Sequence, residues 1–182
     1  MDSRQTAQSR PWLAVGQEIT ELLERIDAEA FDRLTAAFGN PSQRWFFSGQ
    51  GRSGLVAQMA AMRFMHLGRP VHFVGEVSAP SIRSGDALLV ISGSGETPVS
   101  VGFARIARRE GARVATLTHK PKGSLAQIAD VVLHVPVETT AQFGGSLFEQ
   151  SCLILLDSVV FGLAASLPDA HRTMLHRHTN LQ

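Results

Sequence analysis

The chain has 182 residues, 44% hydrophobic and 18% charged, which is enough to bury one core and too few for two ordinary domains. Its 17 basic and 16 acidic residues nearly balance, so the positive excess typical of a nucleic-acid binder is missing. The single cysteine, Cys152, cannot form an intramolecular disulfide and lies in an apolar run, so we expect it to be buried. One domain over residues 1–182, with no nucleic-acid partner, is therefore expected.

Residues 11–38 show the first structural pattern of the chain. Apolar residues recur there at helical spacing, and Gly39-Asn40-Pro41 ends the pattern because proline cannot continue a helical hydrogen-bond ladder. We expect one long amphipathic leading helix within residues 1–40. The residues before it are polar and lack the apolar stretch of an export signal, which favours a cytoplasmic protein.

Short apolar runs then alternate with segments of helical spacing. Strands are predicted over residues 44–48, 71–74, 87–92, 113–118 and 131–135, and helices over 53–67, 98–110 and 124–129. Strands that are apolar throughout are typical of a sheet covered on both faces. The order predicts an α/β fold, a three-layer sandwich whose five-stranded, mostly parallel core sheet occupies residues 41–136.

Two further helices are predicted within residues 144–182. Residues 146–166 are apolar nearly all round, as in a helix buried on most sides, and residues 168–178 carry a basic face. No apolar run is expected to span a membrane, because Gly, Ser, Asp or Arg interrupts each one before the ~20 residues that a bilayer requires. The apolar surface of the first and penultimate helices favours self-association, although core packing would also account for it.

Ligands of an open parallel sheet bind beyond the carboxyl ends of its strands, and two loops there are unusual. Residues 48–54 contain close-approach glycines, including Gly51, but match neither a dinucleotide fingerprint nor a P-loop. Residues 92–97 offer three hydroxyls, those of Ser92, Ser94 and Thr97, directly before a proline suited to a first helical turn. Hydroxyls and backbone N–H groups, such as that of Gly93, predict a phosphate site without lysine. The alternative is an ordinary helix cap.

The loop from Ser92 to Thr97 resembles the phosphate loop of SIS domains, the sugar isomerase fold. The resemblance implies that the three hydroxyls hold a sugar phosphate and that Ser53 lies beside the sugar or the phosphate. Within the family, several stretches are similar to 6-phospho-3-hexuloisomerases: Gly51-Arg52-Ser53-Gly54-Leu55, Ala61-Met62-Arg63-Phe64-Met65-His66-Leu67-Gly68, Val74-Gly75-Glu76, Gly145-Ser146-Leu147-Phe148-Glu149 and Arg177-His178-Thr179-Asn180-Leu181.

This resemblance implies interconversion of D-arabino-3-hexulose 6-phosphate and fructose 6-phosphate through a cis-enediol, without a cofactor or a metal. It also implies a homodimer or homotetramer with pockets between subunits. The pathway would be formaldehyde fixation through ribulose monophosphate, or pentose supply in the reverse direction. No metal site is expected from the residues either, because His66, His72, His119 and His134 lack tight ligand spacing.

Glu149 is the candidate base that moves the proton between C2 and C3 of the sugar. It falls in the first turn of the apolar helix, where the alternative is a capping box with Ser146. His178 is the second catalytic candidate, as a proton donor or ring opener, and its place near the chain end would let it reach a neighbouring subunit. A solvated histidine is the competing interpretation.

Arg52 and Glu76 complete the predicted binding residues. Arg52 would steer the anionic substrate or pair with a carboxylate, and a plain surface arginine is as consistent with the sequence. Glu76 would hydrogen-bond a sugar hydroxyl, or have no role in its loop.

Two other functions remain open from the sequence. One is an isomerase of another sugar phosphate, which would use the same fold and the same enediol chemistry. The other is a non-catalytic phosphosugar-binding SIS module, as in transcriptional regulators, although no helix-turn-helix segment precedes Trp12. A dinucleotide-dependent oxidoreductase does not fit the glycine pattern.

Overall fold

The computed structural model describes residues 10–181, and its strands form one parallel sheet. The strand order is β2-β1-β3-β4-β5, and every neighbouring pair is parallel. The strands are β1 (Trp45–Gly49), β2 (Val71–Phe73), β3 (Ala87–Ile91), β4 (Arg113–Thr118) and β5 (Val131–His134). The predicted α/β sandwich is confirmed, with every strand within two residues of its expected bounds.

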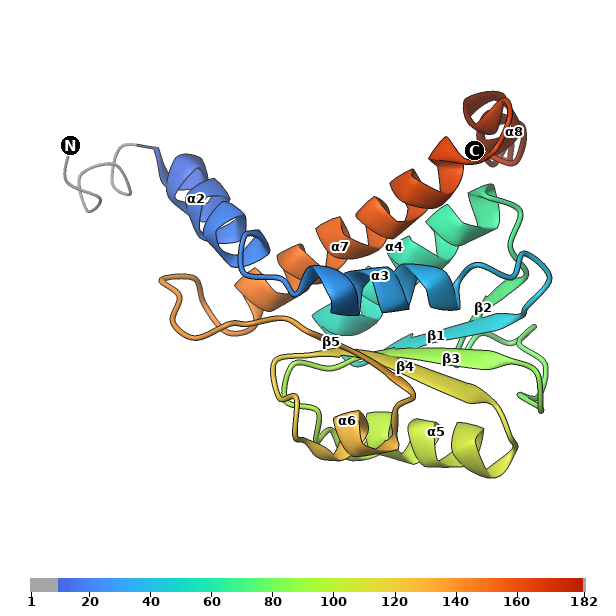
Figure 1. Ribbon diagram of the computed structural model, residues 1–182, viewed down its shortest axis with the longest axis horizontal. Coiled ribbons are helices and arrows are strands. Elements are labelled where there is room, and N and C mark those ends of the chain that lie inside the picture. Colours follow the sequence, from blue (N-terminus) through green and yellow to red (C-terminus); the bar gives the residue numbers. More distant parts are fainter. Residues whose placement is uncertain (1–9, 182) are drawn as a thin grey trace.

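Helices cover both faces of this sheet (Figure 1). On one side lie α3 (Ala28–Ala37), α4 (Arg52–His66) and α7 (Ser146–Ala165), and on the other α5 (Pro98–Arg109) and α6 (Ser124–Ile128). Two more helices, α2 (Pro11–Leu23) and α8 (Ala170–His176), pack against α7. Strands β1 and β3 are buried at every position, which explains their uninterrupted apolar sequences.

Aromatic side chains fill the core between β1 and the helices above it. The Phe38 ring lies 4.0 Å from that of Trp45 and 4.2 Å from that of Phe64, measured between centroids. All three side chains are almost fully buried. This stack joins the end of α3, the start of β1 and the last turn of α4.

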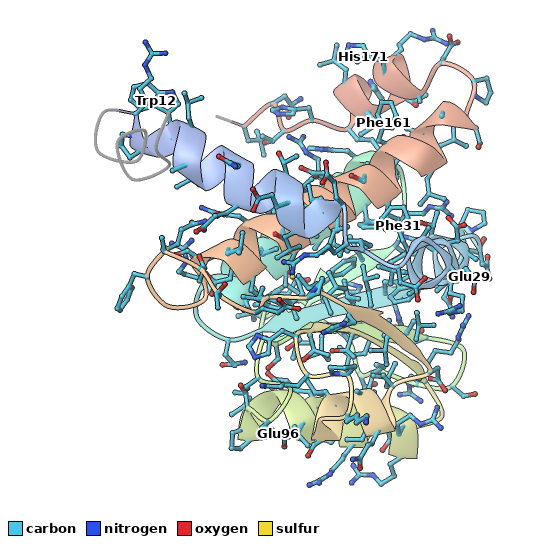
Figure 2. All side chains as sticks on the ribbon, turned by 60° about the vertical axis from the view of Figure 1, so that its left-hand side comes forward. Trp12, Glu29, Phe31, Glu96, Phe161 and His171 are labelled. Carbon is cyan, nitrogen blue, oxygen red and sulfur yellow. The ribbon has the colours of Figure 1, made fainter. Side chains whose placement is uncertain are left out.

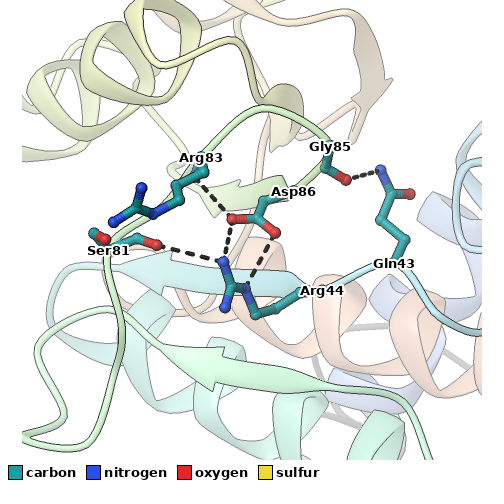
Figure 3. Close-up of polar contacts among 6 residues, drawn as sticks. All are labelled: Gln43, Arg44, Ser81, Arg83, Gly85 and Asp86. Atoms are coloured by element: carbon teal, nitrogen blue, oxygen red, sulfur yellow. Dashed lines mark hydrogen bonds and ion pairs between the residues drawn. The ribbon is translucent and has the colours of Figure 1, made fainter.

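The amino edge of the sheet is held by an ion pair (Figure 3). The Arg44 guanidinium donates Nε to Asp86 Oδ1 at 3.1 Å and a terminal nitrogen to Asp86 Oδ2 at 2.7 Å. Arg44 also donates to the Ser81 carbonyl, and Gln43 donates to the Gly85 carbonyl. These contacts fasten the loop before β3 to the start of β1 with bidentate geometry.

The leading helix differs from its prediction. Instead of one helix over residues 11–38, α2 ends at Leu23 and α3 begins at Ala28. The Asp27 carboxylate accepts the N–H groups of Glu29 at 2.9 Å and Ala30 at 3.2 Å, so it caps α3 and breaks the helix there. The prediction was wrong because the apolar residues keep their helical spacing across the break.

Helix α7 corrects the expectation that no segment could span a membrane. Its 20 residues are long and apolar enough by length and composition alone, because its serines, glycine and aspartate do not interrupt the helix. The helix packs on α4, α2 and α3, as a core helix does. Cys152 is buried in it as expected, and burial, with the nearby Glu149 charge, raises the pKa of its thiol.

Replacing Asp27 by alanine is expected to destabilise the fold by about 1 kcal/mol, because two N–H groups of α3 lose their acceptor. Urea unfolding followed by circular dichroism measures the change. Asp27→Asn, which keeps an acceptor oxygen, should lose much less. Equal loss in both variants would show that the cap does not stabilise α3.

Candidate active site

The loop from Ser92 to Thr97 leads from β3 into α5, as predicted. Thr97 precedes the helix, Pro98 is its first residue, and the three predicted hydroxyls converge. The Ser92 Oγ and Thr97 Oγ1 atoms lie 3.3 Å apart, and Ser94 Oγ lies 3.5 Å from Thr97 Oγ1. Among residues 10–181, the N–H groups of Gly93, Ser94 and Thr97 have no acceptor. Free N–H donors and hydroxyls at the start of a helix are groups that can bind an anion.

Neighbouring elements hold this loop in place. The Gly93 carbonyl accepts the Thr118 hydroxyl at 3.0 Å and the His119 N–H at 3.2 Å. Gly95 has a φ of 67°, and a Cβ there would lie 3.1 Å from Thr118 Oγ1. The loop therefore keeps its shape without a ligand, which reduces the entropy lost when one binds.

Glu96 also belongs to the loop, but its carboxylate turns to α6. It accepts the Ser124 hydroxyl at 2.6 Å and the Ser124 N–H at 2.7 Å, and these two hydrogen bonds lower the pKa of Glu96. Figure 2 shows Glu96 on the α5 and α6 side of the sheet. The carboxylate is thereby fixed to α6 by two hydrogen bonds.

The second predicted loop starts α4 directly against the end of β1. A Cβ on Gly49 would lie 2.6 Å from the Ser53 carbonyl, and one on Gly54 would lie 2.8 Å from the Gly49 oxygen. Gly51, with a φ of 56°, makes the turn that allows this approach. Ser53 is buried, in the first turn of α4.

Arg52 and Glu149 form an ion pair across the first turns of α4 and α7, with Arg52 Nε donating to Glu149 Oε2. The Glu149 side chain is 13% exposed, and that of Arg52 is 61% exposed. The capping-box alternative for Glu149 is wrong, because no side chain caps α7 and the Ser146 hydroxyl donates to the Phe143 carbonyl at 2.9 Å.

The phosphate-type loop also lies beside the first turn of α7. A Cβ on Gly93 would lie 3.5 Å from Cδ1 of Phe148, the residue before Glu149. The amino ends of α4, α5 and α7 thus gather at the carboxyl edge of the sheet (Figure 1). Their aligned peptide dipoles favour an anion there, with a carboxylate and an arginine close by.

Two predicted residues lie elsewhere in this chain. The His178 ring stacks on that of His66 at the far end of α4, with centroids 5.3 Å apart. Since α4 has 15 residues and rises about 1.5 Å per residue, its two ends are roughly 20 Å apart. Glu76 lies beyond the edge strand β2, where its carboxylate contacts His72 Nδ1 at 3.0 Å.

His119 is a residue at this edge that the sequence analysis missed. It follows β4, and its ring meets that of Phe148 edge-on with centroids 5.9 Å apart. Burial, Lys120 and His134 lower the pKa of His119. The signal was available, because His119 follows a strand at its carboxyl end, as the predicted loops do. Within residues 10–181, no three His, Cys, Asp or Glu residues gather as metal ligands.

Comparison with known proteins agrees with this geometry. The SIS-domain family model matches residues 40–157, which include all five strands and the phosphate-type loop. The chain belongs to the SIS-domain family. The resemblance predicted from the sequence is therefore confirmed.

Several relatives carry the name of the predicted enzyme. A 3-hexulose-6-phosphate isomerase of Mycobacterium gastri is 38% identical over 176 residues, covering 92% of this chain and 88% of the relative. One of Bacillus subtilis is 37% identical over 150 residues, covering 78% and 81%. A crystal structure from Methanococcus jannaschii, reported to infer this same function, has a TM-score of 0.83 and 30% identity, covering 92% of this chain and 97% of that one.

Gly49→Ala is expected to destabilise the protein by about 1–3 kcal/mol and to weaken fructose 6-phosphate binding, because its Cβ would push α4 away from β1. Calorimetry and thermal unfolding measure both effects. Gly102→Ala is the matched control, since a Cβ at this position in α5 would meet nothing within 4 Å. Normal ligand affinity in Gly49→Ala would contradict the importance of this close approach.

Proposed function

We propose that the chain is a 6-phospho-3-hexuloisomerase, which interconverts D-arabino-3-hexulose 6-phosphate and fructose 6-phosphate. The observation that carries the proposal is the place of Glu149 in the first turn of α7, one residue after Phe148, whose ring lies beside Gly93 of the Ser92–Thr97 loop. The relatives named 3-hexulose-6-phosphate isomerase support the same reaction through their identity over most of the chain.

The phosphate ester would be bound by neutral donors. The Thr97 hydroxyl lies within 3.5 Å of the hydroxyls of Ser92 and Ser94, and the loop adds its free N–H groups at the start of α5. Such donors, aided by the helix dipole, bind a dianion without a lysine in the loop. Ser53, at the parallel position in α4, would then lie beside the sugar chain.

Glu149 would move the proton. In the 3-hexulose its carboxylate removes the proton from C2, which leaves the anion of a cis-enediol across C2 and C3. The hydroxyl proton of O2 passes to O3, and the carboxylate returns its proton to C3 as the C2 carbonyl forms. One carboxylate serves both steps, so no second acid is needed on the carbon skeleton. Arg52 orients this carboxylate through the ion pair, and its exposed guanidinium is available to attract the anionic substrate.

A second subunit would complete the pocket. In its own chain His178 lies at the opposite end of α4 from Glu149, so a catalytic His178 must act on a neighbouring subunit's substrate. Self-association, as a homodimer or homotetramer, is supported by large apolar side chains exposed along α4 and α7. They are Leu55, Met59, Met62, Met65, Ile154 and Phe161.

The same proposal gives two possible metabolic settings for the reaction, one for each direction. The enzyme would work in the cytoplasm, either in formaldehyde fixation through ribulose monophosphate or in pentose supply. The role of Glu76 as a sugar contact remains a prediction. Its contact with His72 at the edge of the sheet favours a structural role instead.

Glu149→Gln is expected to lower turnover by a factor of about 10² to 10⁴, because the amide cannot accept the C2 proton. Turnover is followed as fructose 6-phosphate formed from ribulose 5-phosphate and formaldehyde, condensed by a separate synthase. Asp32→Asn, an exposed acid on α3, is the control and should stay active. An active Glu149→Gln variant would refute the role of this base.

Mixed oligomers test whether two subunits share one pocket. Glu149→Gln and His178→Gln chains carrying different tags are coexpressed, and the mixed species is purified and assayed. Each parent should be impaired, whereas a mixed dimer should regain about half of the wild-type activity, since one of its two pockets has both residues. A mixed species no better than its parents, or a fully active His178→Gln parent, would contradict the shared pocket.

A further inference from the structure

We infer that His119 is a further binding residue for the phosphate ester and holds a proton while the ester is bound. The inference deepens the proposed function and rests on it, since it concerns the same phosphate site. His119 is the residue directly after β4, and it lies between the phosphate-type loop and the first turn of α7.

The imidazole lies beside the phosphate-type loop and against the first turn of α7. From the position that a Cβ on Gly93 would take, His119 Nδ1 is 3.5 Å away and Cε1 is 3.6 Å away. The ring also packs edge-on against Phe148, so it lies next to the helix turn that carries Glu149. Within residues 10–181 neither ring nitrogen has a hydrogen-bond partner, and the side chain is only partly buried. One polar edge is therefore available to a ligand.

In the free protein, burial and nearby positive groups disfavour a proton on the His119 ring. Lys120 follows it in the chain, His134 lies at the end of the neighbouring strand β5, and both lower the pKa of His119 in addition to the larger effect of burial. On the loop the ring faces uncharged Gly93, and on α7 it faces Phe148, with Glu149 one residue beyond. In the free protein these surroundings therefore favour the neutral imidazole.

A bound phosphate dianion reverses this balance. Negative charge next to the ring favours the imidazolium form, whose ring N–H then donates a charge-assisted hydrogen bond to a phosphate oxygen. The pKa thus lies below its ordinary value of 6.5 in the free protein and rises in the complex. At pH values between the pKa of His119 in the free protein and its pKa in the complex, ligand binding takes up a proton. Over this range the affinity for the ligand falls as the pH rises.

The test is calorimetric titration with fructose 6-phosphate at pH 7 in two buffers of different ionisation enthalpy, which yields the protons exchanged on binding. The variants are His119→Gln and His119→Phe, and the latter preserves a ring beside Phe148. His171→Gln, which replaces an exposed histidine on α8, is the matched control. Any proton released by the ester itself is common to all proteins, so differences from the wild type report on His119.

We expect more proton uptake by the wild type and by His171→Gln than by either His119 variant. Both His119 variants should bind about tenfold more weakly at pH 6.5, and this difference should shrink by pH 8.5. An unchanged melting temperature of His119→Phe without ligand excludes misfolding as the cause.

Two failures can be told apart. If fructose 6-phosphate binds all four proteins with equal affinity and equal proton uptake, His119 is a packing residue and the inference is overturned while the proposed function stands. If the wild type binds no fructose 6-phosphate at any of these pH values, the proposed function is overturned, and the inference with it.

Discussion

The close approach of helix starts to strand ends is the constraint on which the site depends. Gly49 and Gly54 leave no room for a Cβ between β1 and α4, and Gly95 lies nearly as close to Thr118. Because these residues are glycines, the starts of α4 and α5 can approach the strand ends closely. Their backbone N–H groups then lie at the same edge of the sheet as the start of α7. The anion site that we propose at this edge therefore depends on backbone geometry rather than on a cluster of cations.

The two edges of the sheet are stabilised by different means. At the amino edge, a bidentate ion pair between Arg44 and the buried Asp86 carboxylate joins the starts of β1 and β3. This pairing raises the pKa of Arg44. At the carboxyl edge, the polar groups are left partly free: the N–H groups of Gly93, Ser94 and Thr97 have no acceptor among residues 10–181, and the loop hydroxyls contact only groups of their own loop. Binding groups that are unsatisfied in the free protein are what a ligand can satisfy.

The sequence predicted those features that are encoded locally. Each strand could be located because it is a short apolar run, and the Ser92–Thr97 loop because its hydroxyls directly precede a proline. The break at Asp27 was missed because the apolar spacing continues through it, although an aspartate three residues before buried Ala30 is itself a capping signal.

Contacts between distant segments could not be predicted in this way. Arg52 and Glu149 are 97 residues apart in the sequence, and only the packing of α4 on α7 makes them partners. His119 has no motif around it, so its place depends on the register of β4 beside β3. The position of His178 at the far end of α4 is also a consequence of tertiary packing, which turns the C-terminal segment away from its own pocket.

Hydrogen exchange into fructose 6-phosphate tests the central claim most directly. The protein is incubated with fructose 6-phosphate in deuterium oxide without any other enzyme, and the sugar is examined by nuclear magnetic resonance. An enediol across C2 and C3 predicts formation of the 3-hexulose and deuterium at C3 of the remaining fructose 6-phosphate. Deuterium at C1 would identify an aldose–ketose isomerase, and an unchanged sugar that nevertheless binds would identify a non-catalytic phosphosugar-binding module; either result would contradict the account.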